Sequence, residues 1–317
     1  AGACMIKVET SVLTYFKKSD YIRRTIPQIQ KFGGAFGMSI LVDSGEKDGI
    51  MEPGFLQELD RISEWLLAER NSDLYVSRAD SISSIIKTMH RAMNNDDMAY
   101  YRIPDSAETV REYFEIFSGS DDDFDGRIDE FEPLLDEDYR TAMIFAKIKN
   151  PEDNFLYSSE LQVILDKTES HLRKTLPKPY SARITGEPRT IITLTGYVVQ
   201  GQLMSLLSSL GVVFMIVVLL FKNWKAGIVS IIPIGFAVLV SFGIMGWFGI
   251  RLDSATAIIA GITIGIGIDD TIHFLNTFRH FREQRLGIDE TIRKTLAISG
   301  KAIIYTSLVL ILGFSIL

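Results

Sequence analysis

Residues 261–274 read GITIGIGIDDTIHF, an apolar run that is interrupted by the adjacent carboxylates Asp269 and Asp270 and by His273. No Asp, Glu, Lys or Arg occurs in residues 254–268 before the pair, and none occurs in residues 271–278 after it. An ionised carboxylate at this depth of a membrane helix costs on the order of a few kcal/mol, so such groups occur inside a bundle or beside water. The stretch therefore predicts a membrane-spanning helix that carries a functional acid pair.

Further apolar runs surround this stretch. Residues 190–221 and 226–250 carry no charged side chain, and a shorter run covers residues 302–317. A helix of about 20 residues crosses the hydrocarbon core of a bilayer. We therefore expect membrane helices at about 198–221, 226–249, 254–275 and 302–317, the last of them truncated. A buried helix of a soluble protein could produce one such run, but several in succession favour a membrane bundle.

The basic side chains between these runs indicate how the chain crosses the membrane. Lys222 and Lys225 follow the first run, and six more follow the third: Arg279, Arg282, Arg285, Arg293, Lys294 and Lys301. Loops rich in Lys and Arg stay in the cytoplasm, so residues 1–188 are expected to lie on the periplasmic or extracellular side. We expect a multi-pass protein of a bacterial inner (cell) membrane.

Residues 276–300 combine these charges with apolar side chains at helical spacing, namely Phe278, Phe281, Ile288, Ile292 and Leu296. This pattern predicts an amphipathic helix that lies along the inner face of the membrane. The expected organisation is an external domain at 1–188 and a transmembrane segment at 189–317, with 276–300 as a cytoplasmic linker.

The charge distribution separates the same two parts. Residues 1–200 carry 24 Lys or Arg and 34 Asp or Glu, a net charge of −10, whereas residues 201–317 carry nine and six, a net charge of +3. No basic surface excess is available to neutralise phosphates, so a nucleic-acid partner is not expected. Cys4 is the single cysteine, which precludes an internal disulfide. The chain starts without Met and ends inside an apolar run, so we expect a piece of a longer chain.

The acidic part alternates between strand and helix patterns. Strands are expected at 35–43, 74–76, 141–149 and 180–185, and helices at 53–70, 81–93, 108–117 and 155–172. The expected fold class is an α+β external domain followed by an all-α transmembrane helix bundle. Within the external domain we expect two split-βαβ, ferredoxin-like subdomains, at about 30–95 and 105–186.

Small and polar side chains recur every four residues in the third apolar run: Ala257, Gly261, Gly265, Asp269 and His273. They form one stripe on a helix, whose glycines allow a second helix to approach closely. Because protonation removes the charge, the acid pair is suited to carry a proton, and His273 could pass it towards the cytoplasm. Two alternatives stay open. The acids could solvate a helix end at the membrane edge, and His273 could be an interfacial, structural residue.

The stretch with Gly265, Gly267 and the acid pair resembles the fourth transmembrane helix of one half of a resistance–nodulation–division (RND) superfamily transporter. Residues 221–261 and 300–314 resemble helices two, three and five of the same half. Residues 41–66, LVDSGEKDGIMEPGFLQELDRISEWL, resemble the external loop of the branch that includes lipid and hopanoid exporters and Patched-like proteins. The resemblance covers nearly the whole chain.

The resemblance implies twelve spans in two repeats, of which this chain holds one external loop and helices two to five of one half, so the second half is missing. Asp269 and Asp270 match the pair that takes up and releases protons, and Gly265 matches the motif glycine. In pump members a Lys of the other repeat pairs with these acids, and no such Lys occurs in the present spans. Thr306 and Ser307 are the nearby polar candidates, and they could equally be ordinary packing hydroxyls. The DDTIHF version favours the second half.

Residues 121–132 read DDDFDGRIDEFE and match a calcium-binding loop, with carboxylates at Asp121, Asp123, Asp125, Asp129 and Glu132. Pro133 strains the helix that should follow, no second such loop occurs, and a strand pattern begins almost at once. The resemblance places a similar acidic loop here without a calcium role. A solvated loop is therefore preferred, and calcium binding stays as the alternative.

No nucleophile–base pair, phosphate-binding loop or zinc site is present in the sequence, so an enzyme is not expected, nor any cofactor beyond a proton gradient. The expected function is proton-coupled export of a hydrophobic small molecule or lipid, with membrane lipids and the missing half as partners and a homo-oligomer left open. One alternative is a sterol-sensing-type lipid receptor or scaffold that does not pump. Another is a calcium-responsive external domain on a passive anchor.

Overall fold

The computed structural model describes residues 5–8, 16–17, 19–34, 36–117, 131, 133–149 and 156–316. These residues fall into two compact units. The sheet unit comprises the described residues between 10 and 194, and the helical unit comprises those between 1 and 9 and between 195 and 317. Each unit has its own packing and is described by itself.

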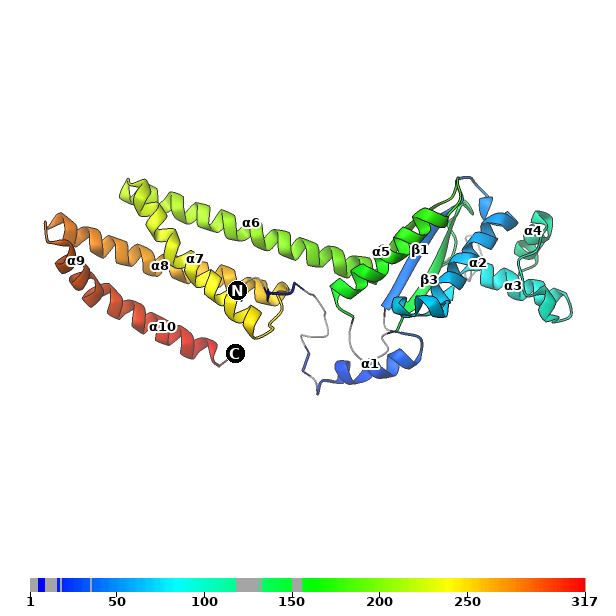
Figure 1. The fold of residues 1–317 in the computed structure, drawn as a ribbon, viewed down its shortest axis with the longest axis horizontal. Coiled ribbons are helices and arrows are strands. Elements are labelled where there is room, and N and C mark those ends of the chain that lie inside the picture. Colours follow the sequence, from blue (N-terminus) through cyan, green and yellow to red (C-terminus); the bar gives the residue numbers. More distant parts are fainter. Residues whose placement is uncertain are drawn as a thin grey trace. The chain divides into compact units, whose positions relative to one another are not determined.

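The sheet unit contains a four-stranded antiparallel sheet (Figure 1) in the order β2-β3-β1-β4. Its strands are β1 (Phe36–Asp43), β2 (Val76–Asp80), β3 (Thr141–Ile148) and β4 (Ser181–Gly186). Ile40 at the centre pairs with Ile144 on one side and with Ile184 on the other. Burial alternates strictly along β1 and β3, as expected where one face of a sheet packs on a core.

Helices complete this unit: α1 (Tyr21–Lys31), α2 (Pro53–Leu67), α3 (Ile82–Met93), α4 (Ala107–Ile116) and α5 (Ser158–Thr175). Short 3-10 helices occupy Gly49–Met51, Glu69–Leu74 and Met98–Tyr100. Pro53 lies in the first turn of α2, where its missing N–H costs nothing. The apolar sides of α2, α3, α4 and α5 join the buried face of the sheet in one hydrophobic core.

The predicted α+β class is confirmed and both split-βαβ units are present, but they do not form separate subdomains, because their strands interleave in one sheet. Strand β3 of the second unit lies between β1 and β2 of the first, and β1 lies between β3 and β4. Neither unit has a hydrogen-bonded strand pair of its own. Alone, each would leave backbone N–H and C=O groups unpaired in its centre, and interleaving satisfies them. The result is the ferredoxin-like, split-βαβ arrangement at the level of the whole unit.

Two local expectations also differ from the structure. The strand expected at 74–76 begins only at Val76 and continues to Asp80, because the fully buried Leu74 ends the preceding 3-10 helix. Strand β2 lies at an edge of the sheet, where polar side chains are tolerated, so its sequence VSRAD lacks an apolar signature. Helix α1 was not expected.

The helical unit contains α6 (Glu187–Phe221), α7 (Trp224–Trp247), α8 (Ser254–Glu283), α9 (Ile288–Thr295), a π-helical turn (Leu296–Gly300) and α10 (Lys301–Phe314). Within the described residues, four segments are long and apolar enough to cross a membrane: Glu187–Phe221, Trp224–Trp247, Thr256–Glu283 and Ile288–Phe314. The chain is therefore a multi-pass membrane protein. Val213 of α6, Ile234 of α7 and Ile264 of α8 pack together in the centre of this unit.

The single amphipathic helix expected over residues 276–300 is divided in the structure. Its first part continues α8 as far as Glu283, and its second part forms α9 and leads through the π-helical turn into α10 (Figure 1). The break has a local cause, because Arg285 adopts a left-handed conformation (φ 58°) and Gly287 precedes the next helix. The Ser299 hydroxyl donates to Thr277 Oγ1 at 2.8 Å and ties the two parts together.

An N-terminal segment belongs to the helical unit. The Leu252 N–H donates to the Lys7 carbonyl at 2.9 Å, and Val8 forms a parallel bridge with Leu252. Ile6 and Val8 pack against buried Met245. The boundary between the units thus falls between residues 194 and 195, whereas we expected it between 188 and 189. Residues 5–8, expected in the external domain, belong to the helical unit.

Candidate functional site

The predicted acid pair lies in the middle of α8. This helix has 30 residues and is about 45 Å long at a rise of 1.5 Å per residue, which exceeds the roughly 30 Å core of a bilayer. At its start the Thr256 N–H donates to Asp253 Oδ1 at 2.8 Å and caps the helix. Because α8 continues to Glu283, Asp269 and Asp270 do not lie at the end of this helix, and that part of the alternative is wrong.

Of the predicted stripe on α8, Gly261, Gly265, Asp269 and His273 are exposed within this chain, whereas Ala257 is buried. Asp269 Oδ1 and His273 Nε2 lie 3.6 Å apart, and their side chains are 75% and 73% exposed. A Cβ added to Gly261 or Gly265 would meet no atom within 4 Å. The close helix contact expected at these two glycines is therefore not made by any residue that the structure describes.

Gly267 has a different environment from the two stripe glycines. A Cβ at this position would lie 3.3 Å from Ile234 Cγ1 of α7. Such a contact is tight, so the missing side chain of Gly267 lets α7 and α8 approach each other. Gly267 thus contributes to the packing of α7 against α8. Gly261 and Gly265 lie on a different face of α8, where an added Cβ meets no atom.

A groove between α8 and α10 brings several of the predicted residues together. It has a volume of about 530 Å³ and is lined by Gly265, Ile266, Asp269 and Asp270 from α8 and by Tyr305, Thr306, Val309 and Leu310 from α10. Thr306 shares this groove with both carboxylates, whereas Ser307 does not line it. The walls are mainly apolar, so the carboxylates have few competing polar neighbours.

Tyr305 is the polar groove residue that the sequence analysis does not predict. It lies four residues before Val309, and both line the groove from the same face of α10. A phenol is a donor and acceptor that suits a partly apolar wall. The signal that could have found it is its place beside Thr306 on a span otherwise rich in aliphatic side chains.

The hydroxyls of Thr271 and Thr306 donate to backbone carbonyls of their own helices. Thr271 Oγ1 donates to the Gly267 carbonyl at 2.6 Å, and Thr306 Oγ1 donates to the Ile303 carbonyl at 3.0 Å. This pattern is the usual way in which Thr is accommodated in a membrane helix. The oxygen of Thr306 keeps a lone pair and can accept a further hydrogen bond in the groove.

Basic side chains lie at the end of α8 and not in the groove. None of the described residues that line the groove is Lys or Arg. Arg279 forms an ion pair with Glu283 (Nε to Oε1, 2.8 Å) and donates to the Leu220 carbonyl near the end of α6 (3.3 Å). Among the described residues, the side chain within ion-pair distance of Asp269 is His273, one turn further along α8.

The calcium-like loop is not part of what the structure describes. Its five carboxylates, Asp121, Asp123, Asp125, Asp129 and Glu132, lie outside the described residues. Among the residues that are described, no group of three or more His, Cys, Asp or Glu side chains could hold a metal ion.

Comparison with known proteins connects this geometry to a family. The model of the MMPL family matches residues 134–317, which is more than half of the chain and includes β3 to α10. A Methanocaldococcus jannaschii protein named "Putative membrane protein MJ1562" is 23% identical over 321 aligned residues, which cover 99% of this chain and 76% of that protein. The matched region contains the whole groove.

Proposed function

Because the chain belongs to the MMPL family of RND-type membrane transporters, we propose that it takes part in exporting a hydrophobic, lipid-like substrate in exchange for protons. The family membership agrees with the resemblance noted in the sequence. The observation that carries the proposal is the groove in which Asp269 and Asp270 lie together at the middle of a membrane-crossing helix, beside Tyr305 and Thr306.

The proposed chemistry is reversible protonation of the acid pair. Two adjacent carboxylates in a mainly apolar groove repel each other and lose solvation, so binding a proton relieves both costs. The neutral pair then tolerates closer packing of α8 with its neighbours than the charged pair does. A change of packing that depends on protonation is a two-state element of the kind that couples a proton gradient to transport.

The exposed stripe supports the same proposal. A membrane helix does not present ionised side chains to lipid, so the face with Gly261, Gly265 and Asp269 needs a protein or water cover in the working transporter. The two glycines offer a smooth surface for another helix. In this proposal the helices of a second repeat, or a second copy of the chain, cover the face and complete the proton site, in which His273 relays protons.

The orientation is part of the proposal. The basic ends of α7, α8 and α9 would lie in the cytoplasm and the sheet unit on the external side. The sheet unit would receive or conduct the substrate there, without enzymatic turnover.

The experiment that tests the proposal uses the whole protein in liposomes with an imposed pH gradient. The movement of an NBD-labelled single-chain lipid across the membrane is followed by fluorescence quenching. The double variant D269N/D270N keeps the size of both side chains but cannot titrate, so gradient-driven movement should fall to the level of protein-free liposomes. The control is D289N in the first turn of α9, a carboxylate that does not line the groove, and it should transport as the wild type does.

Two results would overturn the proposal. Gradient-driven transport that persists in D269N/D270N would exclude the acid pair as the proton carrier. Lipid binding by the wild-type protein with no movement under any gradient would favour a lipid receptor without pumping.

A further inference from the structure

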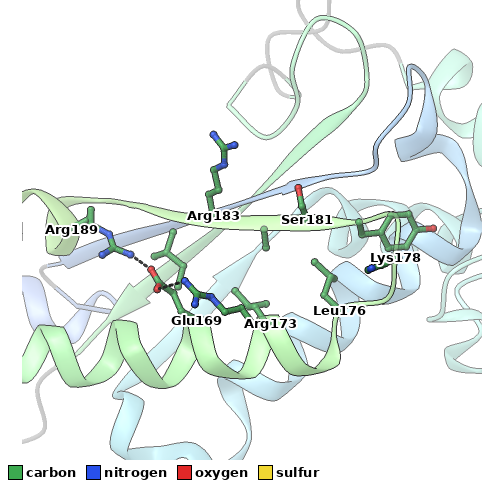
Figure 2. Close-up of a pocket in the computed structure, with 11 residues that line it drawn as sticks. Glu169, Arg173, Leu176, Lys178, Ser181, Arg183 and Arg189 are labelled. Atoms are coloured by element: carbon green, nitrogen blue, oxygen red, sulfur yellow. Dashed lines mark hydrogen bonds and ion pairs between the residues drawn. The ribbon is translucent and has the colours of Figure 1, made fainter.

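The sheet unit contains a cleft between α5 and the edge strand β4, with a volume of about 560 Å³ (Figure 2). This volume lies within the range of roughly 300–1,000 Å³ that is usual for small-molecule sites. The residues that line it lie between positions 169 and 189, so one continuous piece of chain builds both walls. The groove of the proposed proton site is separate from it and belongs to the helical unit.

The floor of the cleft is apolar. Leu172 of α5 and Ile184 of β4 are almost fully buried, and Leu176 and Ala182 extend the same surface towards the mouth. Ala182 and Ile184 alternate with the exposed Ser181 and Arg183, as expected for neighbouring positions of a strand. An aliphatic chain of a few carbons would find continuous apolar contact here.

The rim of the cleft has an excess of positive charge. Glu169 is its single carboxylate among the described lining residues, and two arginines compensate it: Arg189 forms a hydrogen-bonded ion pair with it, and Arg173 Nη2 lies 3.8 Å from its Oε2. Figure 2 shows Glu169 between these two arginines. With Lys178 at the other end and Arg183 on β4, the described lining residues carry four positive charges against one carboxylate, an excess of three.

Arg173 is the cation best placed to bind something else. Its side chain is 82% exposed, and its ion-pair partner among the described residues is Glu169, a carboxylate 3.8 Å away that Arg189 already binds. A guanidinium presents a fork of donors that matches a carboxylate or a phosphate. Arg173 and Lys178 both line the cleft beside its apolar floor, so both would attract an anionic group held there.

We propose that this cleft binds the head and first carbons of a single-chain anionic amphiphile, a carboxylate or a phosphate monoester. The apolar floor takes the chain, and Arg173 and Lys178 take the head. Its role as a substrate site rests on the proposed export function, whereas binding itself requires no proton gradient. Failure of the two proposals can therefore be distinguished.

The test measures photo-labelling of the whole protein in nanodiscs of phosphatidylcholine, a lipid with no net charge. The probe is dodecanoic acid with a diazirine on its chain, and the labelled peptides are identified by mass spectrometry. Labelling is expected in the peptides that contain Leu176 and Ala182. Dodecyl phosphate should compete with the probe, whereas dodecanol and inorganic phosphate should not, because each lacks one half of the recognised chemistry.

Charge reversal at the rim provides the decisive comparison. R173E/K178E should lose labelling at these peptides at least about tenfold, since charge-assisted hydrogen bonds become repulsions. The milder R173Q/K178Q should show a smaller loss in the same direction. The control is K174E, the neighbouring cation on α5 that does not line the cleft, and it should label like the wild type.

The outcomes separate the alternatives. Labelling that R173E/K178E and R173Q/K178Q both leave unchanged would overturn the proposal. Equal competition by dodecanol would also overturn it, because the cleft would then select only for apolar character. Equal competition by inorganic phosphate would overturn it as well, because the cleft would then bind any anion without its chain. D269N/D270N should label like the wild type, whatever its transport activity.

Discussion

At the scale of single residues, the most constrained titratable group outside the spans is His90. It is 9% exposed on α3, and its Nδ1 lies 2.8 Å from the hydroxyl of Tyr113 on α4. The Asn94 amide also points at this nitrogen, at 3.4 Å. Two donors directed at Nδ1 indicate that it accepts, so the neutral imidazole carries its proton on Nε2. Burial, followed by the charge of Arg102, lowers the pKa of His90, while Asp105 opposes the shift.

This depressed pKa predicts that acid weakens the sheet unit. Below about 6.5 the unfolded chain binds more protons than the folded one, so the free energy of unfolding falls as the pH falls towards the folded pKa. Burial and Arg70 lower the pKa of His171 in the same direction, so both histidines contribute. Hydrogen-exchange protection factors of amides in α3 and α4 should be lower at about pH 5 than at about pH 7.5.

Substitution of His90 alone tests whether this residue causes the loss of protection at low pH. H90Q keeps an acceptor for Tyr113 but cannot gain a proton, so the loss of protection in α3 and α4 on acidification should shrink. H171Q should leave α3 and α4 nearly as pH-sensitive as in the wild type. Protection that rises on acidification would have the wrong sign and would refute the argument.

At the scale of elements, the α6–α7 hairpin depends on the absence of one side chain. A Cβ at Gly227 would lie 2.6 Å from Val218 Cγ2 and 2.7 Å from the Phe214 ring. The Ser230 hydroxyl donates to the Gly227 carbonyl at 2.7 Å in the same buried region. Backbone and side chains approach closely here, which is how membrane helices obtain their packing energy.

G227V should therefore destabilise the hairpin. Overpacking of a tight contact costs about 1–3 kcal/mol, which should appear as a lower midpoint of thermal unfolding in detergent. The matched control is G235A on the same helix, where an added Cβ meets nothing within 4 Å. A midpoint unchanged by G227V, or lowered equally by G235A, would contradict a specific contact at Gly227.

Elements were predictable where one physical signal dominates. Long uncharged runs located the membrane helices, because burial in hydrocarbon leaves no room for charges. The ends were missed where charges do not stop a helix, as at Arg279 and Glu283, which form an ion pair on the last turns of α8. The pairing of β1 with β3 could not be read from either segment, because register between distant strands depends on the whole core. The sequence suggested the acid pair and Thr306, but the groove needed the positions of α8 and α10, and Tyr305 emerged only with them.

At the scale of the whole molecule, the distribution of charged residues predicts which side of the membrane each part of the chain lies on. The basic turn between α8 and α9 and the acidic sheet unit are proposed to lie on opposite sides of the membrane. In a C4S background, which removes the only native cysteine, a cysteine at Lys174 should react with a membrane-impermeant maleimide in intact cells. A cysteine at Gln284, in the exposed turn after α8, should react only after permeabilisation. Equal labelling of the two cysteines in intact cells would contradict the proposed orientation.

The interleaved sheet also determines when the protein can fold during its synthesis. Strand β1 is made early, but Phe36 pairs with Ile148 and Asp43 pairs with Ser181, so its partners are made last. At about 5–20 residues per second, the ribosome needs on the order of ten seconds to supply them. Until β3 is made the apolar face of β1 has no partner strand, and β4 is finished only one residue before α6 begins. The sheet unit can therefore complete its sheet only when the membrane helix α6 is about to be made, so biogenesis of this chain joins the last step of sheet formation to the start of a membrane helix.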